Sequence, residues 1–413
     1  MKNFKNMFLS VQHLLAMFGA TVLVPILTGF DPTVALFCAG LGTLIFHLCT
    51  KGKVPVFLGS SFAFIPVVIA ANEISGGDIA YAQGGIIVAG LIYVIMSFLI
   101  KSIGIDRIKK YFPPHVTGAM IVVIGLNLIP TAINMAKDNI LIALITLIVT
   151  FLIHFFGKGF FKQMGILIGI IVGYIISLAF GQVDLTSVTS ASLIQIPNFS
   201  LSKFSMETII IIAPIVIAVF MEHVGDMTTN GAVVGKNFIE DPGLNRTLLG
   251  NGLATMVSGL IGGPANTTYG ENTAVLAITK NYNPKLLRRT AVFAMLLAFI
   301  GVFGGFLQSI PSFVMGGISI ILFSMISFIG GKTIYDNKCI ANKKNLIIIS
   351  AILIVGIGTT YLSNMGINIG IPVTKDISIT GLSLAAIVGI ILNRIVNHQE
   401  FKKNQRVKEA LEF

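Results

Sequence analysis

The chain contains 413 residues, of which 54% are hydrophobic and 11% are charged, whereas about 25% of the residues of an average soluble protein are charged. This composition excludes an ordinary soluble globular protein, a disordered chain and a collagen. The net charge of +11 does not indicate nucleic-acid binding, because the basic residues lie beside alternate apolar segments, as membrane topology requires. We therefore expect a lipid bilayer, and no nucleic acid, as the partner of this chain.

Apolar stretches recur along the whole chain and are separated by short polar stretches. Most of them approach the roughly 17–25 residues that a helix needs to cross a bilayer. The sequence therefore predicts an all-α polytopic membrane protein with about fourteen transmembrane segments. In chain order, the predicted segments are 8–28, 32–49, 56–72, 84–103, 114–134, 139–155, 165–180, 207–229, 246–262, 267–281, 287–307, 311–331, 345–364 and 378–397.

The distribution of positive charge predicts the orientation of these segments. Of the 28 Lys and Arg residues, only Lys137, Lys203 and Lys375 fall on connections that we assign to the outside. Cytoplasmic connections of membrane proteins carry an excess of Lys and Arg. We therefore predict a multi-pass protein of the plasma membrane with both termini in the cytoplasm.

The two halves of the chain contain equal numbers of predicted segments. Residues 181–205 form the longest weakly hydrophobic connection, with seven segments before it and seven after it. An odd number of crossings starts on one side of the membrane and ends on the other. The second half is therefore expected to be inverted relative to the first, as in many secondary transporters.

One segment in each half contains a sequence that is poorly suited to a full-length helix. Val54–Ala63 can be laid over Ala265–Ala274, which aligns Gly59 with Gly270. We predict a short extended segment followed by a half-helix in each. Unpaired backbone in hydrocarbon costs several kcal/mol per group, so the extended segments should pair with each other or line a protected cavity. The alternative is a pair of loops that merely contain Gly and Pro.

Three acidic residues, Glu222, Asp226 and Glu271, fall at membrane depth without an accompanying Lys or Arg in the predicted segments. Each carboxylate near the bilayer centre costs about 2.5–3.5 kcal/mol or more, so such residues are usually functional. Glu222 and Asp226 are four residues apart and share a helix face. Glu271 follows Gly270 at the expected N-terminus of a half-helix, whose dipole favours a carboxylate. Alternatively, these acids cap helix ends or face a water-filled vestibule.

The acids suit a carrier that binds both a polar ring and a proton. An ionised carboxylate accepts hydrogen bonds from N–H groups, whereas a protonated one can donate. Two further residues have open interpretations. His13 either hydrogen-bonds across the bundle toward the site or packs as a neutral residue, and Phe62 either stacks on a planar ligand or contacts core or lipid.

Sequence signatures of other functions are missing. The chain has no HExxH motif, no CxxC pair and no cluster of His and Cys. These are the patterns typical of metal sites and of several hydrolases. We therefore expect no enzyme, no metal and no cofactor other than a co-transported proton.

Five stretches, found in this order, are similar to motifs of one known family. They are Gln12–Pro25, Gly59–Phe64, Glu222–Asp226, Asp241–Arg246 and Asn266–Asn272. These stretches resemble the nucleobase/ascorbate transporter family, and within it the bacterial uracil permeases. The resemblance implies two inverted seven-segment repeats, in which segments 3 and 10 contribute short antiparallel strands that meet at the substrate.

The resemblance also implies two domains, each built from both halves of the chain. The core domain would comprise residues 1–110 and 207–309, and the gate domain residues 111–206 and 310–397, followed by a cytoplasmic tail at 398–413. Because dimers are usual in the family, a homodimer through the gate domain is expected.

The resemblance further assigns roles to individual residues. Glu222 and Glu271 match the glutamates that bind the substrate. Phe62 and Gly270 match positions whose backbone approaches the base, and His13 matches a histidine that supports the site. The first four residues are the substrate-binding candidates, and His13 is a candidate for supporting the site.

Asp226 departs from the pattern, because many uracil permeases have His there and the purine-transporting branch often has Asp. Glu271 follows the pyrimidine pattern, since purine members commonly have Gln. We predict import of uracil or a close pyrimidine base in symport with protons by alternating access, with Asp226 tuning or carrying the proton. The alternatives are a purine permease of the xanthine or urate type, a sulfate-permease-type anion transporter, which three acids would serve poorly, and a membrane-embedded enzyme.

Overall fold

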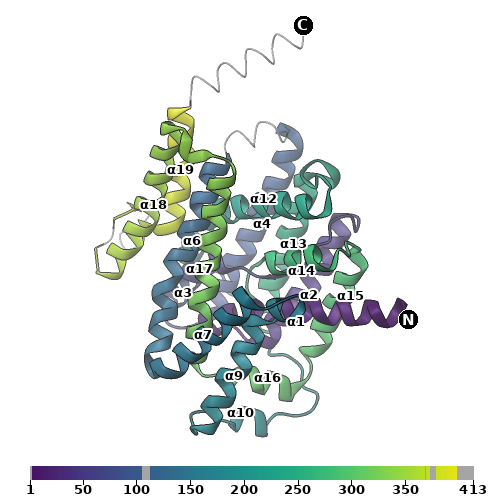
Figure 1. Ribbon diagram of the computed structural model, residues 1–413. Helices are drawn as coiled ribbons and strands as arrows, with labels where there is room; N and C mark the ends of the chain where they lie inside the picture. The colour runs from purple at the N-terminus through teal and green to yellow at the C-terminus, as the bar shows by residue number, and fades with distance from the viewer. Residues whose placement is uncertain (1, 105–111, 368, 373–377, 398–413) are drawn as a thin grey trace.

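The computed structural model describes residues 2–104, 112–367, 369–372 and 378–397. The predicted tail at 398–413 and Lys375 lie outside the described residues. Most of the described chain is helical (Figure 1). Seven of the described helices are long and apolar enough to cross a membrane, and shorter apolar helices cover Phe62–Ile74, Gly165–Ala179 and Gly381–Val396. The all-α membrane fold is confirmed, whereas the count of fourteen segments stays a prediction.

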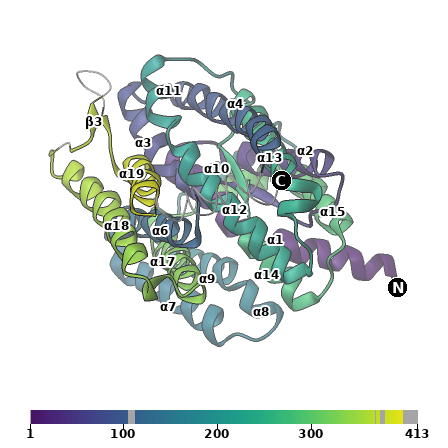
Figure 2. The same cartoon turned by 90° about the horizontal axis from the view of Figure 1, so that it is seen from above.

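The helices form two packed groups, which lie side by side in Figure 2. The first group comprises α1 (Lys2–Thr28), α2 (Pro32–Cys49), α3 (Ile65–Ile74), α4 (Ile79–Ile103), α11 (Met206–Ile212), α12 (Ile215–Val234), α13 (Leu244–Leu260), α14 (Gly270–Thr279), α15 (Pro284–Leu297) and α16 (Gly301–Gln308). The second group comprises α6 (Pro114–Ala136), α7 (Ile140–Phe156), α9 (Gly165–Ala179), α17 (Ser312–Asp336), α18 (Lys343–Asn364) and α19 (Gly381–Val396). The shorter elements are β1 (Leu58–Ser60), η1 (Phe62–Phe64), η2 (Lys137–Asn139), α8 (Phe160–Gln163), α10 (Thr186–Thr189), η3 (Ile239–Gly243), β2 (Asn266–Thr268), η4 (Cys339–Ala341), β3 (Ile371–Pro372) and β4 (Ser378–Ile379).

Glycines allow helices within each group to approach closely. A Cβ atom on Gly90 of α4 would lie 2.8 Å from the carbonyl oxygen of Gly252 of α13. One on Gly125 of α6 would lie 2.4 Å from the carbonyl oxygen of Phe323 of α17. Small residues are typical of such contacts, because packing and not the hydrophobic effect drives helix association in lipid. Each group is therefore packed backbone against backbone at these points.

Two buried strands from the two halves of the chain pair with each other. β1 is antiparallel to β2, with Gly59 opposite Thr267. The amide of Tyr269 extends the pairing by donating to the carbonyl oxygen of Phe57 at 3.0 Å. This pairing satisfies backbone groups that would otherwise be unpaired within the bilayer. The predicted antiparallel strands of segments 3 and 10 are confirmed, and each leads into a short helix, η1 with α3 in one half and α14 in the other.

The alignment predicted between these two stretches is wrong by three residues. One residue separates the end of β1 from Phe62, where η1 begins, and one residue separates the end of β2 from Gly270, where α14 begins. Phe62 is therefore equivalent to Gly270, and Gly59 is equivalent to Thr267. The reason is that backbone hydrogen bonds determine the strand bounds, whereas the alignment matched two glycines that have different surroundings.

Besides segments 3 and 10, two further predicted segments are not continuous helices. Segment 207–229 is divided into α11 and α12 at Pro214, because proline lacks the N–H group that a continuing helix needs. Segment 287–307 is divided into α15 and α16, and the backbone between them pairs with the long connection, where the amide of Gln195 donates to the carbonyl oxygen of Phe299 at 2.9 Å. In both places a local backbone constraint interrupts an apolar stretch.

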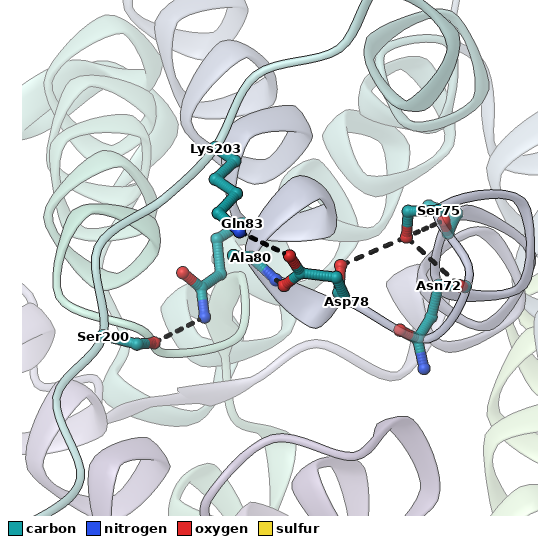
Figure 3. A network of polar contacts seen from close by, with 8 residues as sticks. Asn72, Ser75, Asp78, Ala80, Gln83, Ser200 and Lys203 are labelled. Atoms are coloured by element: carbon teal, nitrogen blue, oxygen red, sulfur yellow. Dashed lines mark hydrogen bonds and ion pairs between the residues drawn. The ribbon is translucent and has the colours of Figure 1, made fainter.

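The long connection, residues 181–205, lies against the first helix group, and its short helix α10 packs on α16. Figure 3 shows its contacts with the start of α4, where Lys203 Nζ pairs with Asp78 Oδ2 at 2.7 Å and Gln83 Nε2 donates to Ser200 Oγ at 2.8 Å. The ammonium of Lys203 lowers the pKa of the Asp78 carboxyl, because it stabilises the ionised form. From α10 onward the connection is therefore attached to the first group.

Candidate substrate site at the strand crossing

Glu222 and Asp226 lie one turn apart on α12. Asp226 accepts a hydrogen bond from Thr268 Oγ1 of β2 at 2.5 Å, which joins α12 to the strand crossing. Glu222 Oε2 is buried and has no hydrogen-bond partner among the described residues. Because a buried polar atom without a partner is costly and uncommon, this oxygen is a candidate for binding a ligand.

Glu271 lies in the first turn of α14, directly after β2. Its neighbour Gly270 is exposed, and a Cβ atom added there would meet no other atom within 4 Å. Because the adjoining strand is buried, this exposure indicates open space at the N-terminus of the half-helix. The free N–H groups and the dipole of a helix N-terminus attract hydrogen-bond acceptors and anions. A ligand beside Glu271 can therefore reach the backbone at Gly270.

The three carboxyl groups form one electrostatic cluster. Glu222 interacts with Asp226 and Glu271, and Asp226 also interacts with Glu271. The ion pairs formed between described residues lie elsewhere, joining Lys53 to Asp241 and Lys203 to Asp78. Within the described ranges, no three or more His, Cys, Asp or Glu side chains are placed to hold a metal ion. The cluster can accept N–H donors and can take up a proton.

His13 is buried on α1 and contacts α14 through Asn272. The amide nitrogen of Asn272 lies 3.2 Å from His13 Nδ1 and donates to the carbonyl oxygen of His13 at 3.1 Å. Since Asn272 directly follows Glu271, these contacts hold the first turn of α14 against α1. His13 therefore makes a hydrogen bond across the bundle, which is the first of its two predicted alternatives.

Aromatic rings adjoin the strand crossing. The ring of Phe62 is nearly parallel to that of Tyr269, at 9° with centroids 6.5 Å apart, and meets the ring of Phe323 edge-on at 6.0 Å. Tyr269 packs against Gly59 and donates its hydroxyl hydrogen to the carbonyl oxygen of Ser60 at 3.0 Å. Because Phe323 belongs to α17, the rings connect the strand crossing with the second helix group.

A cavity of about 670 Å³ lies between the two helix groups and reaches Phe62. One wall comes from η1, α3, α11 and the start of α12, and the other from α6, α18 and α19. At its other end the cavity is lined by Glu73 and Ile74, which are exposed. Its size is typical of small-ligand sites. The cavity therefore connects the surface with the strand crossing.

All six residues that the sequence singles out lie around this crossing, either in the acid cluster, beside it on α14, or one contact away. Sequence reasoning missed three residues that complete the arrangement. They are Thr268, Tyr269 and Asn272. Each is a polar residue within two positions of Gly270 or Glu271, which is the signal that could have identified them.

Two antiparallel strands, each leading into a short helix, meet at a buried acidic cluster within a multi-pass helical membrane fold, and this arrangement defines the transporter class. The chain belongs to the Permease family (Xan_ur_permease), whose sequence pattern matches residues 4–365. The predicted resemblance to nucleobase transporters is therefore confirmed.

Several relatives are similar over nearly the whole chain. The chain is 40% identical to the "Probable uracil permease" of Haemophilus influenzae, across 95% of this chain and 94% of the relative. It is 41% identical to the "Uracil permease" of Bacillus caldolyticus, across 94% of this chain and 91% of the relative. It is 40% identical to the "Uracil permease" of Escherichia coli K12, across 94% and 90% respectively.

Solved structures share the fold. The overall structure of SLC26A9 matches 95% of this chain and 64% of that chain with a TM-score of 0.71 at 11% identity. The transmembrane domain of the cyanobacterial bicarbonate transporter BicA matches 90% of this chain and 98% of that chain with a TM-score of 0.64 at 15% identity. At these identities the similarity shows the fold alone.

Proposed function

We propose that this protein imports uracil, or a close pyrimidine base, across the plasma membrane in symport with protons. The observation that carries the proposal is the buried Glu222 Oε2 atom, which lacks a partner within the described chain and lies in a cluster with Asp226 and Glu271. The relatives of 40–41% identity are named uracil permeases. This favours a pyrimidine over a purine, an inorganic anion or an enzymatic reaction.

The chemistry of the site matches a flat ring with N–H and C=O groups. Carboxyl oxygens of Glu222 and Glu271 suit the N–H groups of such a ring, and the free backbone N–H groups at the start of α14 suit its carbonyl oxygens. Phe62 offers an aromatic surface to the face of the base. The open space at Gly270 leaves room for the ring next to the backbone.

The acid cluster also supports the proposal of a co-transported proton. The three carboxyl groups form no ion pair with any described Lys or Arg and repel one another, so protonation of one reduces the charge that the base must approach. Asp226, which Thr268 holds at the edge of the cluster, tunes or carries this proton beside Glu222. Proton and base would then enter and leave the site together.

The two helix groups suit the moving parts of an alternating-access carrier. We assign the first group, which contains the acids and both strands, to the core domain and the second group to the gate domain. Residues 186–205 pack on the first group and would move with it. We therefore propose that the hinge between α9 and the core domain lies within residues 180–185. In this proposal both termini lie in the cytoplasm, and the gate domain forms the contact of a homodimer.

Uptake of labelled uracil into transport-deficient cells tests the substrate and its site. We expect Glu222→Gln to abolish high-affinity uptake, whereas Glu207→Gln, which makes the same change at an exposed acid of α11, should retain it. Excess unlabelled xanthine should leave uracil uptake unchanged. Normal uptake by the Glu222→Gln variant would exclude this residue from the site, and strong competition by xanthine would favour a purine permease.

Proteoliposomes test the coupling. Uracil added to one side should drive proton movement in the same direction through the unmodified protein. The Asp226→Asn variant should bind uracil and lose the accompanying proton flux. Full coupling in that variant would place the proton on another residue.

A further inference from the structure

The two walls of the 670 Å³ cavity differ in chemistry. The wall of the first helix group is apolar and includes Ile65, Pro66 and Ile69 of α3 together with Ile211 and Ile215. The opposite wall contains polar side chains of α6, α18 and α19. A cavity with one apolar and one polar wall suits a flat ligand that hydrogen-bonds along one edge and packs with its face.

The polar wall is built mainly by one face of α6. Asn127, Thr131 and Asn134 all line the cavity, and their spacing of four and three residues places them on one side of the helix over about 10 Å. Pro130 also lines the cavity, and its missing N–H leaves the carbonyl oxygen of Leu126 without its helical donor. We call Asn127, Thr131 and Asn134 the α6 ladder.

The α6 ladder has unused hydrogen-bonding capacity. Asn127 Nδ2 donates to Gly356 O and to Thr360 Oγ1, both at 3.1 Å, which orients the side chain and leaves Oδ1 without a donor from any described residue. Thr131 Oγ1 likewise has no partner in the described part of the chain. Asn134 Oδ1 accepts from Lys137 Nζ at 2.8 Å, so its NH₂ group can still donate. The ladder therefore offers acceptors and donors in a row.

Charge identifies the kind of ligand that the cavity suits. Among the described residues that line it, Glu73 is the only charged one, and it is exposed at the end remote from Phe62. An ion deeper in the cavity, away from Glu73 and from the Lys137 ammonium at Asn134, would lose hydration without gaining a counter-charge. A neutral ring with amide-type N–H and C=O groups can exchange its water for the ladder.

We propose that the cavity contains a second binding station for the transported base, where its edge hydrogen-bonds the α6 ladder and its face packs on Pro66 and Ile69 before it reaches the acid cluster. The proposal rests on the proposed function, because it takes the base to be the ligand. It assigns a binding role to gate residues that are distinct from Glu222, Asp226 and Glu271. Phe62, at the inner end of the cavity, marks the passage between the two stations.

Thiol labelling of purified protein in detergent tests the station directly. In a Glu222→Gln background, which disables the acid cluster, we expect millimolar uracil to slow the labelling of Thr131→Cys several-fold. Ser102→Cys, exposed on α4 away from the cavity, is the control and should label equally with and without uracil. Labelling of the native cysteines should be low, because Cys38 and Cys339 are buried and Cys49 is half-buried.

The outcomes are distinguishable. Slowing at Thr131→Cys and not at Ser102→Cys supports the second station. Slowing that occurs with Glu222 present and disappears in the Glu222→Gln background overturns it, because the acid cluster then accounts for all binding. If the unmodified chain binds no uracil in equilibrium dialysis, the proposed function fails, and the station fails with it.

Uptake kinetics give an independent readout. Thr131→Val removes one hydroxyl at nearly constant volume, so we expect the KM for uracil uptake to rise about two- to tenfold, the change expected for one hydrogen bond, with an unchanged equilibrium Kd at the acid cluster. Thr333→Val, at a half-buried threonine of α17 that does not line the cavity, is the matched control and should leave both constants unchanged. An unchanged KM for Thr131→Val, or an equal change of KM and Kd, would overturn the proposal.

Discussion

The contact between Gly59 and Tyr269 allows a sharp test of the strand crossing. A Cβ atom on Gly59 would lie 2.3 Å from two ring carbons of Tyr269, whereas carbon atoms pack best at about 3.5–4.0 Å. Gly59→Ala must therefore displace the ring by more than about 1 Å. The displaced ring would lose the 3.0 Å hydrogen bond from its hydroxyl to the carbonyl oxygen of Ser60.

The expected magnitude follows from these two losses. Inserting a methyl group into a packed site typically costs about 1–3 kcal/mol, and the lost hydrogen bond adds about 0.5–1.5 kcal/mol. We expect Gly59→Ala to lower the free energy of unfolding by about 2–4 kcal/mol. Because Tyr269 precedes the half-helix that contains Glu271, uracil binding should weaken as well.

Thermal unfolding in detergent and equilibrium uracil binding measure both effects. Gly331→Ala is the matched control, since a Cβ atom there meets nothing within 4 Å, and it should leave stability nearly unchanged. Combining Gly59→Ala with Tyr269→Ala should cost clearly less than the sum of the single changes, because the clash is then removed. Unchanged unfolding of Gly59→Ala, or strict additivity in the double variant, would refute the reasoning.

Of three further predictions, two concern contacts around the site and the third concerns the ion pair between the long connection and the start of α4. Thr268→Val should lower the free energy of unfolding by about 1–3 kcal/mol, because Asp226 loses its donor, whereas Thr267→Val removes a buried hydroxyl that has no partner in the described chain and should not destabilise; chemical denaturation compares the two. Asn272→Ala should cost a similar amount and weaken uracil binding, because the first turn of α14 loses its contacts with His13; binding unchanged from the parent would argue against this anchor. The pKa of Asp78 is lowered by Lys203, so the stabilisation that the ion pair provides is present above about pH 4 and is lost as the pH falls through the folded-state value. The effect should be small because the pair is exposed, and Asp78→Asn should remove that part of the acid sensitivity in unfolding scans between neutral and acidic pH.

Local patterns in the sequence were sufficient to predict several residues that the fold brings together at the candidate site. The four-residue spacing of Glu222 and Asp226 places them on one face of any helix, and the glycine before Glu271 marks the start of a half-helix. Hydropathy alone located most of the helices, because crossing a bilayer imposes a length and a composition on each segment. It failed at Pro214 and between α15 and α16, where a backbone constraint interrupts an apolar stretch.

The amino-acid sequence by itself determined that this is a helical membrane protein with buried acids and with an extended stretch before a half-helix in segments 3 and 10. Hydropathy and helix periodicity are properties of neighbouring residues, so the sequence contains them directly. Only the tertiary structure decided the strand register and two hydrogen bonds between residues that are distant in sequence. Thr268 donates to Asp226, 42 positions away, and Tyr269 donates to Ser60, 209 positions away. The polar and apolar walls of the cavity also come from different helix groups. The physical reason is that such contacts depend on how whole helices pack, which no local pattern contains.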